Sequence, residues 1–325
     1  MIKMLKQAAL VLASSLLIQS AVGAEKITYL FPAPDTLPAF APFQIAKHKG
    51  YYADEGLDVS FQIGKGGADV AKQVAVGNAD MGGGIGDTPI VTRANGLKVK
   101  GVALLGGQAL TQIAVRRDAN IHKPEELRGK AIGVLSFKDT TYYNLLAVLA
   151  SAGLSQSDAS VQALGPGGII KLMISGDIQA MSGVPEWVAA VQGAGIELDV
   201  WNINDIFPAM AQAMFASDET IEKRSQAVQG FVNATLKAVR EIQASPQQAT
   251  ADYIAAVPSH QGEEAQITDI LTRYTQLVYP TQAPQQLGQF DPSRLKTVQD
   301  FYLSNDIVRT AVPIEDTYTN QFVQD

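Results

Sequence analysis

The sequence predicts an α/β protein with two lobes, each built on a largely parallel sheet flanked by helices. Short β-rich runs alternate with helical stretches, which is the pattern of α/β layers. The chain has 325 residues, 46% of them hydrophobic, which suits two domains with a sizeable core. The stretch 72–81 also resembles 171–180, because each places a lysine five residues before a glycine and then a short apolar run. One such echo in each half of the α/β region favours two lobes built on the same plan.

Strands are expected where apolar and β-branched residues run between glycines, prolines or charged residues. These predicted strands are 26–31, 57–63, 79–82, 99–105, 112–116 and 130–135. Helices are expected where apolar residues recur at helical spacing between capping residues. These predicted helices are 42–49, 68–76, 142–152, 219–244, 263–278 and 292–303. The glycine-rich stretch 64–67 is expected to be a strand-to-helix turn, because it lacks the last spaced glycine of a dinucleotide loop.

The first 24 residues have the pattern of a cleaved secretory signal peptide. Lys3 and Lys6 precede an apolar run of about 11 residues, and the segment ends in the small residues 22–24. The apolar run is too short for the roughly 20 residues of a membrane-spanning helix. We therefore expect a mature chain that begins at Glu25 and is secreted to a bacterial periplasm. Because the chain has no cysteine, we expect no lipid attachment there.

Composition and missing motifs exclude several classes of function. Without cysteine the chain cannot form disulfides, thiolate zinc sites, Fe–S clusters or a cysteine nucleophile. A net charge of −7 with no basic block argues against nucleic acid as a partner. The three histidines are scattered, and no HExxH, GxSxG or Walker A pattern occurs. The Ser-x-x-Lys string at 293–296 reads as a helix start. We therefore expect no catalytic residues, no metal and no cofactor, so that the chain is not an enzyme.

Several strand-to-helix junctions carry side chains suited to binding a small molecule. In open α/β sheets, ligands bind outside the carboxyl ends of the strands, where helix N-termini present free N–H groups. The predicted ligand-binding residues in the first half of the chain are Asp35, Thr36, Phe40, Asp87, Thr88 and Gln108. For each of them a purely structural role stays open: Phe40 as core, Asp87 or Thr88 as a helix cap, and Gln108 as part of a glycine-rich turn.

The junction 136–143 is the richest of these candidates. Its predicted ligand-binding residues are Lys138, Thr140, Thr141 and Tyr142. A cation, two hydroxyls and helix-N-terminal amides together favour a carboxylate or sulfonate, although a well-capped helix start is the structural alternative. Later in the chain, Glu186 could accept from an amine and Trp187 could form a wall of the pocket. The combination suggests a small organic acid or zwitterion.

Four stretches resemble the periplasmic solute-binding proteins of ABC importers for sulfonates, taurine, nitrate and thiamine pyrimidine precursors. They are 41–59, 77–80, 123–130 and 176–178, in the order found in that family. The resemblance covers about residues 27–240 and implies a two-lobed type II periplasmic binding protein fold with two crossover segments. It implies a first lobe of residues 25–113 and 212–325, with a second lobe of residues 114–211 between them. One departure is Gln179, where the family repeats the acidic residue of Asp80.

The resemblance implies a monomeric periplasmic protein that binds a small molecule and delivers it to a permease in the inner membrane. Hinges are expected near 113–116 and 207–214. A taurine-like or other sulfonate ligand is the main expectation, and a pyrimidine or an aromatic acid is the alternative. Two further alternatives are an enzyme related to pyrimidine-precursor synthases and an interaction protein that reports the ligand to a membrane sensor.

Overall fold

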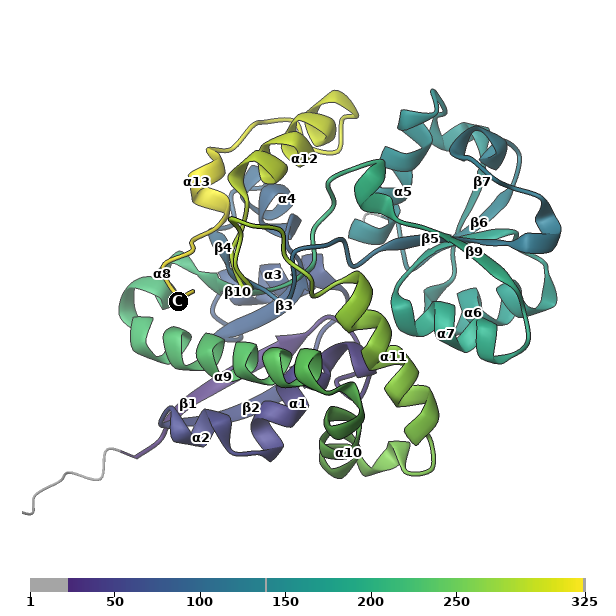
Figure 1. Ribbon diagram of the computed structural model, residues 1–325. Helices are drawn as coiled ribbons and strands as arrows, with labels where there is room; N and C mark the ends of the chain where they lie inside the picture. The colour runs from purple at the N-terminus through teal and green to yellow at the C-terminus, as the bar shows by residue number, and fades with distance from the viewer. Residues whose placement is uncertain (1–22, 138, 324–325) are drawn as a thin grey trace, which may run out of the picture.

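The computed structural model describes residues 23–137 and 139–323 and contains two separate five-stranded sheets (Figure 1). The first sheet has the order β2-β1-β3-β10-β4, and the second has the order β7-β6-β8-β5-β9. The strands of the first sheet are β1 (Glu25–Phe31), β2 (Leu57–Ile63), β3 (Met81–Ile85), β4 (Val99–Leu104) and β10 (Gln212–Ser217). Those of the second are β5 (Gln112–Arg116), β6 (Ala131–Val134), β7 (Ser160–Ala163), β8 (Ala180–Gly183) and β9 (Leu198–Trp201). The predicted signal peptide lies outside the described residues except for its last two.

Both sheets are mixed rather than wholly parallel, because β10 and β5 run antiparallel to both of their neighbours. These two strands are antiparallel because the chain enters each sheet at the carboxyl ends of its neighbouring strands. Gln112, the first residue of β5, pairs with Gly183 at the carboxyl end of β8, and Gln212 of β10 pairs with Ile85 at the carboxyl end of β3. The chain therefore leaves one sheet at its carboxyl edge and enters the other at the same kind of edge, so no crossover helix is needed.

Two segments, 105–111 and 202–211, connect the sheets and run beside each other. The N–H of Leu105 donates to Gln212 O at 2.7 Å, and that of Leu110 donates to Met210 O at 3.1 Å. The predicted hinge at 113–116 is instead part of β5, in the interior of the second sheet. A strand paired on both sides cannot absorb a hinge rotation, so the preceding segment is the flexible candidate. The exact lobe limits at 113 and 212 stay a prediction.

Helices cover both sheets, and the longest, α9, lies along the first one (Figure 1). The helices beside the first sheet are α1 (Ala41–His48), α2 (Tyr51–Asp54), α3 (Gly67–Ala75), α4 (Thr88–Ala94), α8 (Asp218–Lys223), α9 (Ser225–Ala244), α10 (Pro246–Ala256), α11 (Glu264–Leu277), α12 (Pro292–Ser304) and α13 (Ile314–Thr317). Those beside the second are α5 (Thr140–Ser151), α6 (Gly165–Ser175) and α7 (Pro185–Gly193). Within the described ranges, no helix has the length and apolar character needed to cross a membrane.

An aromatic cluster fills the core under the first sheet. Tyr29 of β1 stacks on Phe231 of α9 with ring centroids 5.0 Å apart, and Phe43 of α1 lies 4.8 Å from the Tyr29 ring. All three side chains are fully buried. Such aromatic pairs stabilise by about 0.5–1.5 kcal/mol beyond the area they bury. The cluster fixes β1, α1 and α9 as one rigid body beneath the loop that follows β1.

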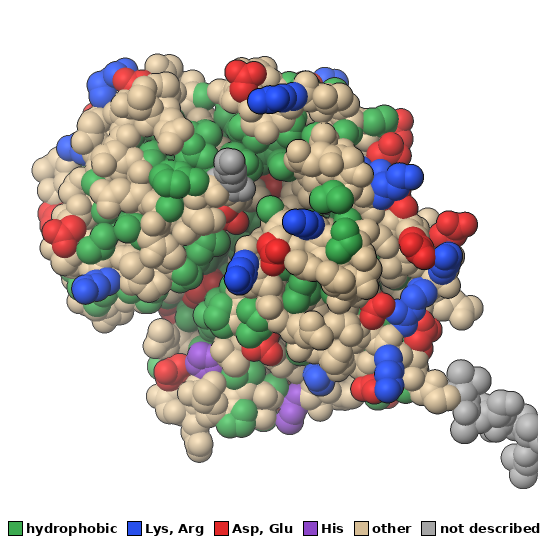
Figure 2. All heavy atoms as spheres, turned by 180° about the vertical axis from the view of Figure 1, so that it is seen from behind, with side chains coloured by type: hydrophobic (Ala, Val, Ile, Leu, Met, Phe, Trp, Pro, Cys, Tyr) green, Lys and Arg blue, Asp and Glu red, His purple; other side chains and the backbone are tan. Residues whose placement is uncertain are grey.

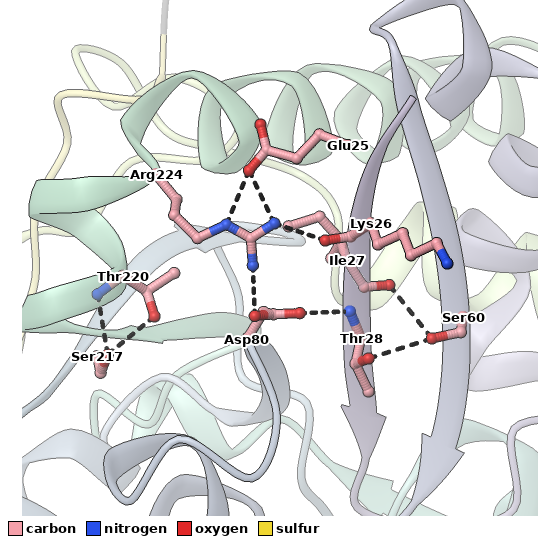
Figure 3. Close-up of polar contacts among 9 residues, drawn as sticks. All are labelled: Glu25, Lys26, Ile27, Thr28, Ser60, Asp80, Ser217, Thr220 and Arg224. Carbon is pink, nitrogen blue, oxygen red and sulfur yellow. Dashed lines mark hydrogen bonds and ion pairs between the residues drawn. The ribbon is translucent and has the colours of Figure 1, made fainter. Parts of the chain in front are cut away.

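The repeated helix–glycine–strand unit keeps one polar contact in both lobes. Asp80 Oδ2 accepts from the N–H of Thr28 in the neighbouring strand at 2.7 Å, and Gln179 Oε1 accepts from that of Ala131 at 3.0 Å. Gln179, which departs from the family's acidic residue, therefore makes the same contact to the neighbouring strand as Asp80 does. Figure 3 shows the additional partner of Asp80, the guanidinium of Arg224, which also pairs with Glu25.

Candidate functional site

The candidate site is a cavity between the two lobes, at the carboxyl edges of both sheets. Figure 2 shows a groove between the lobes on this face, with apolar and acidic side chains visible inside it. The cavity has a volume of about 90 Å³. It is lined by Pro32, Ala33, Leu37, Ala39, Phe40, Gly66, Gly67, Gly84, Ile85, Leu110, Leu135, Asp139, Thr140, Thr141, Pro166, Val184, Glu186, Trp187, Gln212 and Tyr274.

Most of the cavity wall is apolar, and three of its side chains are large aromatics. Phe40 follows β1, Trp187 lies in the first turn of α7, and Tyr274 projects from α11. Phe40 also packs on Phe31 at 4.5 Å, so it serves the core and the cavity together. Aromatic and apolar walls with a few placed polar groups are typical of sites for small organic molecules.

Glu186 is the buried carboxylate on one side of the cavity, and it joins the two lobes. It lies in α7, and its Oε2 accepts from the hydroxyl of Tyr274 in α11 at 2.7 Å. Burial raises the pKa of Glu186 to about 6, although the hydrogen bond from Tyr274 opposes this shift. Because α7 packs beside the second sheet and α11 beside the first, this hydrogen bond crosses the cleft.

The start of α5 brings Asp139, Thr140 and Thr141 to the cavity wall. Asp139 is the N-cap: its Oδ1 accepts from the N–H of Thr141 at 2.9 Å and from its hydroxyl at 2.8 Å. Burial raises the pKa of Asp139. The free amides that the sequence suggested for an anion are therefore in contact with the chain's own carboxylate. Lys138, the predicted cation of this junction, lies outside the described residues.

Asp87 lies behind this wall, just before α4. Its side chain is fully buried, and its Oδ2 accepts from the hydroxyl of Tyr302 at 2.9 Å, whereas Oδ1 has no hydrogen-bond partner. Burial raises the pKa of Asp87 to about 7, and the nearby charge of Asp139 raises it further. Thr88, the next residue, has a buried hydroxyl without a partner, close beneath Gly67 of the wall. Neither residue lines the cavity directly.

Four other predicted residues lie away from the cavity wall. The carbonyl of Asp35 accepts from the Gln44 amide at 2.9 Å, and the carbonyl of Thr36 accepts from the Tyr253 hydroxyl at 2.5 Å. Gln108 lies on the first connecting segment and reaches Pro280 O at 3.5 Å. The hydroxyl of Tyr142 donates to Gln156 Oε1 at 2.6 Å.

Three polar or aromatic cavity residues, Asp139, Gln212 and Tyr274, were not among the predicted ligand-binding residues. Asp139 lies within the junction 136–143, which the sequence had singled out. Tyr274 lies inside a helix, far from any strand end, and only tertiary packing brings it to Glu186. Gln212 did carry a signal, because it is a single polar residue at the start of the buried strand β10.

The charge of the site is acidic. Among the described lining residues, the titratable side chains are those of Asp139, Glu186 and Tyr274, and none is a lysine, arginine or histidine. In the same part of the chain, no three His, Cys, Asp or Glu side chains gather as metal ligands would. The site therefore offers hydrogen-bond acceptors beside aromatic surface.

The fold and sequence match known proteins over most of the chain. The chain is 25% identical to the riboflavin-binding protein RibY of Chloroflexus aurantiacus over 87% of its length and 82% of that protein. It is 24% identical to the 4-amino-5-hydroxymethyl-2-methylpyrimidine phosphate synthase of Aspergillus parasiticus, over 73% of the chain and 72% of the enzyme. The structure of the alkanesulfonate-binding protein SsuA from Xanthomonas axonopodis pv. citri, bound to MOPS, superposes with a TM-score of 0.70 at 16% identity, covering 92% of this chain and 100% of that one.

These likenesses establish the periplasmic binding protein fold. The family model described as NMT1/THI5 like matches residues 37–249, which is more than half of the sequence. The chain therefore belongs to the NMT1/THI5-like family.

Proposed function

We propose that this protein is the solute-binding component of an ABC importer, which captures a small molecule between its lobes in the periplasm. The observation that carries the proposal is the cavity itself, whose walls come from both lobes and which the Glu186–Tyr274 hydrogen bond spans. A solute that contacts both walls stabilises the closed state, and a permease then distinguishes the closed state from the open one. The names of RibY and SsuA support a binding role.

For the ligand we propose a planar heteroaromatic molecule with N–H donors. The aromatic walls of Phe40 and Trp187 suit a flat ring, and the carboxylates of Asp139 and Glu186 accept from N–H groups. This corresponds to the pyrimidine alternative left open by the sequence. The sulfonate expectation depended on Lys138 and on free amides at the start of α5, and Asp139 now caps those amides. An anion at that wall would meet two carboxylates, which repel it.

Calorimetric titration of the secreted form tests both levels of this proposal. The panel is riboflavin, 4-amino-5-hydroxymethyl-2-methylpyrimidine, taurine, MOPS, nitrate and benzoate. We expect tight binding of one of the two heteroaromatic compounds and none of the anions. Tight binding of taurine or MOPS alone would overturn the heteroaromatic ligand but not the binding role. A Glu186→Gln variant that binds the heteroaromatic compound as the parent does would show that this carboxylate is no acceptor for it.

The synthase relatives make an enzyme the main competing function. A binding protein returns its ligand unchanged, so we expect the compound recovered after prolonged incubation to be chemically intact. A covalently altered product would support the enzyme instead. Deleting the gene distinguishes an importer from a sensor, because loss of an importer component abolishes uptake of the ligand whereas loss of a sensor leaves uptake in place.

A further inference from the structure

Besides their backbone hydrogen bonds, the connecting segments between the lobes share a side-chain contact, the guanidinium of Arg294. Asp291 caps α12 by accepting from the N–H of Ser293 at 2.8 Å, which sets the first turn of the helix and the direction of Arg294. The Arg294 guanidinium donates through Nη1 to Gly107 O and through Nη2 to Ala209 O. Nη2 also donates to Asn204 Oδ1 at 3.1 Å. One guanidinium therefore contacts both connecting segments.

The three acceptors lie at different points along these segments. Gly107 and Ala209 are on the halves nearer the first sheet, and α12 lies on the side of that sheet (Figure 1). Asn204 is near the end that joins the second sheet, and its Oδ1 also accepts from the N–H of Ala109 at 3.0 Å. If the lobes rotate about these segments, the contacts to Gly107 and Ala209 can persist, whereas the contact to Asn204 changes. The Arg294–Asn204 contact is thus the one that reports the angle between the lobes.

The partial burial of the Arg294 guanidinium costs free energy, which a role in setting the angle between the lobes would explain. Its three acceptors are neutral, its Nε is buried without a hydrogen-bond partner, and burial lowers its pKa. Arg294 is half-buried, and taking a cation partly out of water costs free energy that its neutral acceptors offset only in part. The nearest opposite charge that favours the cation is Asp291, at the start of the same helix.

We propose that Arg294 is a positioning residue that acts through Asn204 to set the balance between open and closed lobes, and through it the affinity for the solute. Its donors favour the arrangement seen in this structure, in which Asn204 lies within their reach and the Glu186–Tyr274 hydrogen bond crosses the cleft. The role is separate from ligand contact, because neither residue lines the ligand cavity.

The distance between the lobes can be measured without knowing the solute. Because the chain has no cysteine, Lys171→Cys on α6 and Gln247→Cys on α10 place two spin labels at exposed sites on opposite lobes. Pulsed electron–electron double resonance then gives the distribution of distances between the two labels. Asn204→Ala is expected to widen it toward longer distances and to weaken binding of the compound identified by titration roughly five- to tenfold. Asn204→Asp keeps the acceptor and adds a charge facing the guanidinium, so it should narrow the distribution and tighten binding.

Arg294→Met tests the guanidinium directly. Arg273→Met is its matched control because, within the described residues, the ion pair of Arg273 is with Asp269 on the same helix, α11. We expect Arg294→Met to behave as Asn204→Ala does and the control to behave as the parent. Distance distributions that are the same in both Asn204 variants and the parent would overturn the proposal, whatever happens to the melting temperature. Because this readout needs no ligand, it stands even if the proposed solute is wrong.

Discussion

At the scale of the residue, the site is marked by three carboxyl groups whose pKa values burial raises. Asp87 and Glu186 are both buried beside tyrosine hydroxyls, and Asp139 caps α5 at the cavity wall. Desolvation disfavours the charged form of each, so these groups respond to pH where surface carboxylates do not. The acidic character of the site thus follows from the burial of these three carboxylates in the fold. The sequence alone showed only that acidic residues follow these strands.

Asp87 is expected to make the folded state less stable as pH rises. Its pKa is raised from 3.8 to about 7, so the folded protein binds a proton that the unfolded chain releases between these values. Stability should therefore fall as pH increases from about 4 to 7. Asp87→Asn removes this loss and should increase the unfolding free energy at pH 8 by about 2–4 kcal/mol, with little gain at pH 4.

Urea unfolding at pH 4, 6 and 8 measures this effect, with Asp205→Asn as the control because Asp205 is exposed. An equal change at pH 4 and pH 8 would contradict an ionisation effect and indicate altered packing against Tyr302.

Glu186 is expected to make ligand binding weaker in acid. Its pKa is about 6, and only the ionised form offers both oxygens to N–H donors, one of them already shared with Tyr274. Affinity for the heteroaromatic ligand should fall as pH drops from 7 to 5.

Tyr274→Phe removes the hydrogen bond across the cleft and should weaken binding at pH 7 about fivefold. Titration calorimetry at several pH values checks both, and an unchanged affinity in Tyr274→Phe would show that this hydrogen bond does not hold the lobes together.

At the scale of the element, most strand-to-helix units could be predicted because their signals are local. The helix at 292–303 has Asp291 and Pro292 at its start, and the structure places α12 at Pro292–Ser304. The predicted helix 219–244 is two helices, α8 and α9, which meet at Arg224. Arg224 leaves the helical path there, and its guanidinium pairs with Asp80 and Glu25. That contact joins residues far apart in the chain, so no local pattern announces it.

The glycine pair 106–107 is a second feature whose role local sequence could not decide. Its sequence allowed either a plain turn or a close approach of backbone to a ligand. The structure shows close approach to the chain itself: a Cβ on Gly106 would lie 2.1 Å from Val278 O. Gly106→Ala should therefore push the first connecting segment away from the end of α11 and destabilise the protein by several kcal/mol.

Thermal unfolding tests this effect against Gly193→Ala, because a Cβ on Gly193 at the end of α7 meets nothing within 4 Å. The control should unfold at or slightly above the parent temperature, since alanine reduces the entropy of the unfolded chain. Equal melting temperatures for the two variants would mean that the segment can shift without cost.

At the scale of the whole molecule, two lobes were predictable because the helix–glycine–strand unit occurs at both 72–81 and 171–180. How the lobes meet was not predictable, since it depends on contacts such as Glu186–Tyr274 and the ring contact of Tyr143 with Tyr302, whose centroids are 5.4 Å apart. These pairs join residues 88 and 159 positions apart. The antiparallel β5 and β10 also follow from the meeting of the lobes, because both strands start at the shared edge.

The start of the mature chain gives a last prediction at this scale. We propose that cleavage follows Ala24, so that Glu25 becomes the first residue. Arg224 Nε donates to Glu25 Oε1 at 2.7 Å, and Arg224 Nη2 donates to Lys26 O at 2.5 Å, so β1 is anchored from its first residue (Figure 3). Cleavage further along would remove these contacts and expose the edge of β1. Intact-mass measurement of the periplasmic protein should therefore give a chain starting at Glu25. Arg224→Met should leave the start at Glu25 unchanged but lower the melting temperature. A start beyond Lys26 in the parent would contradict the proposed site.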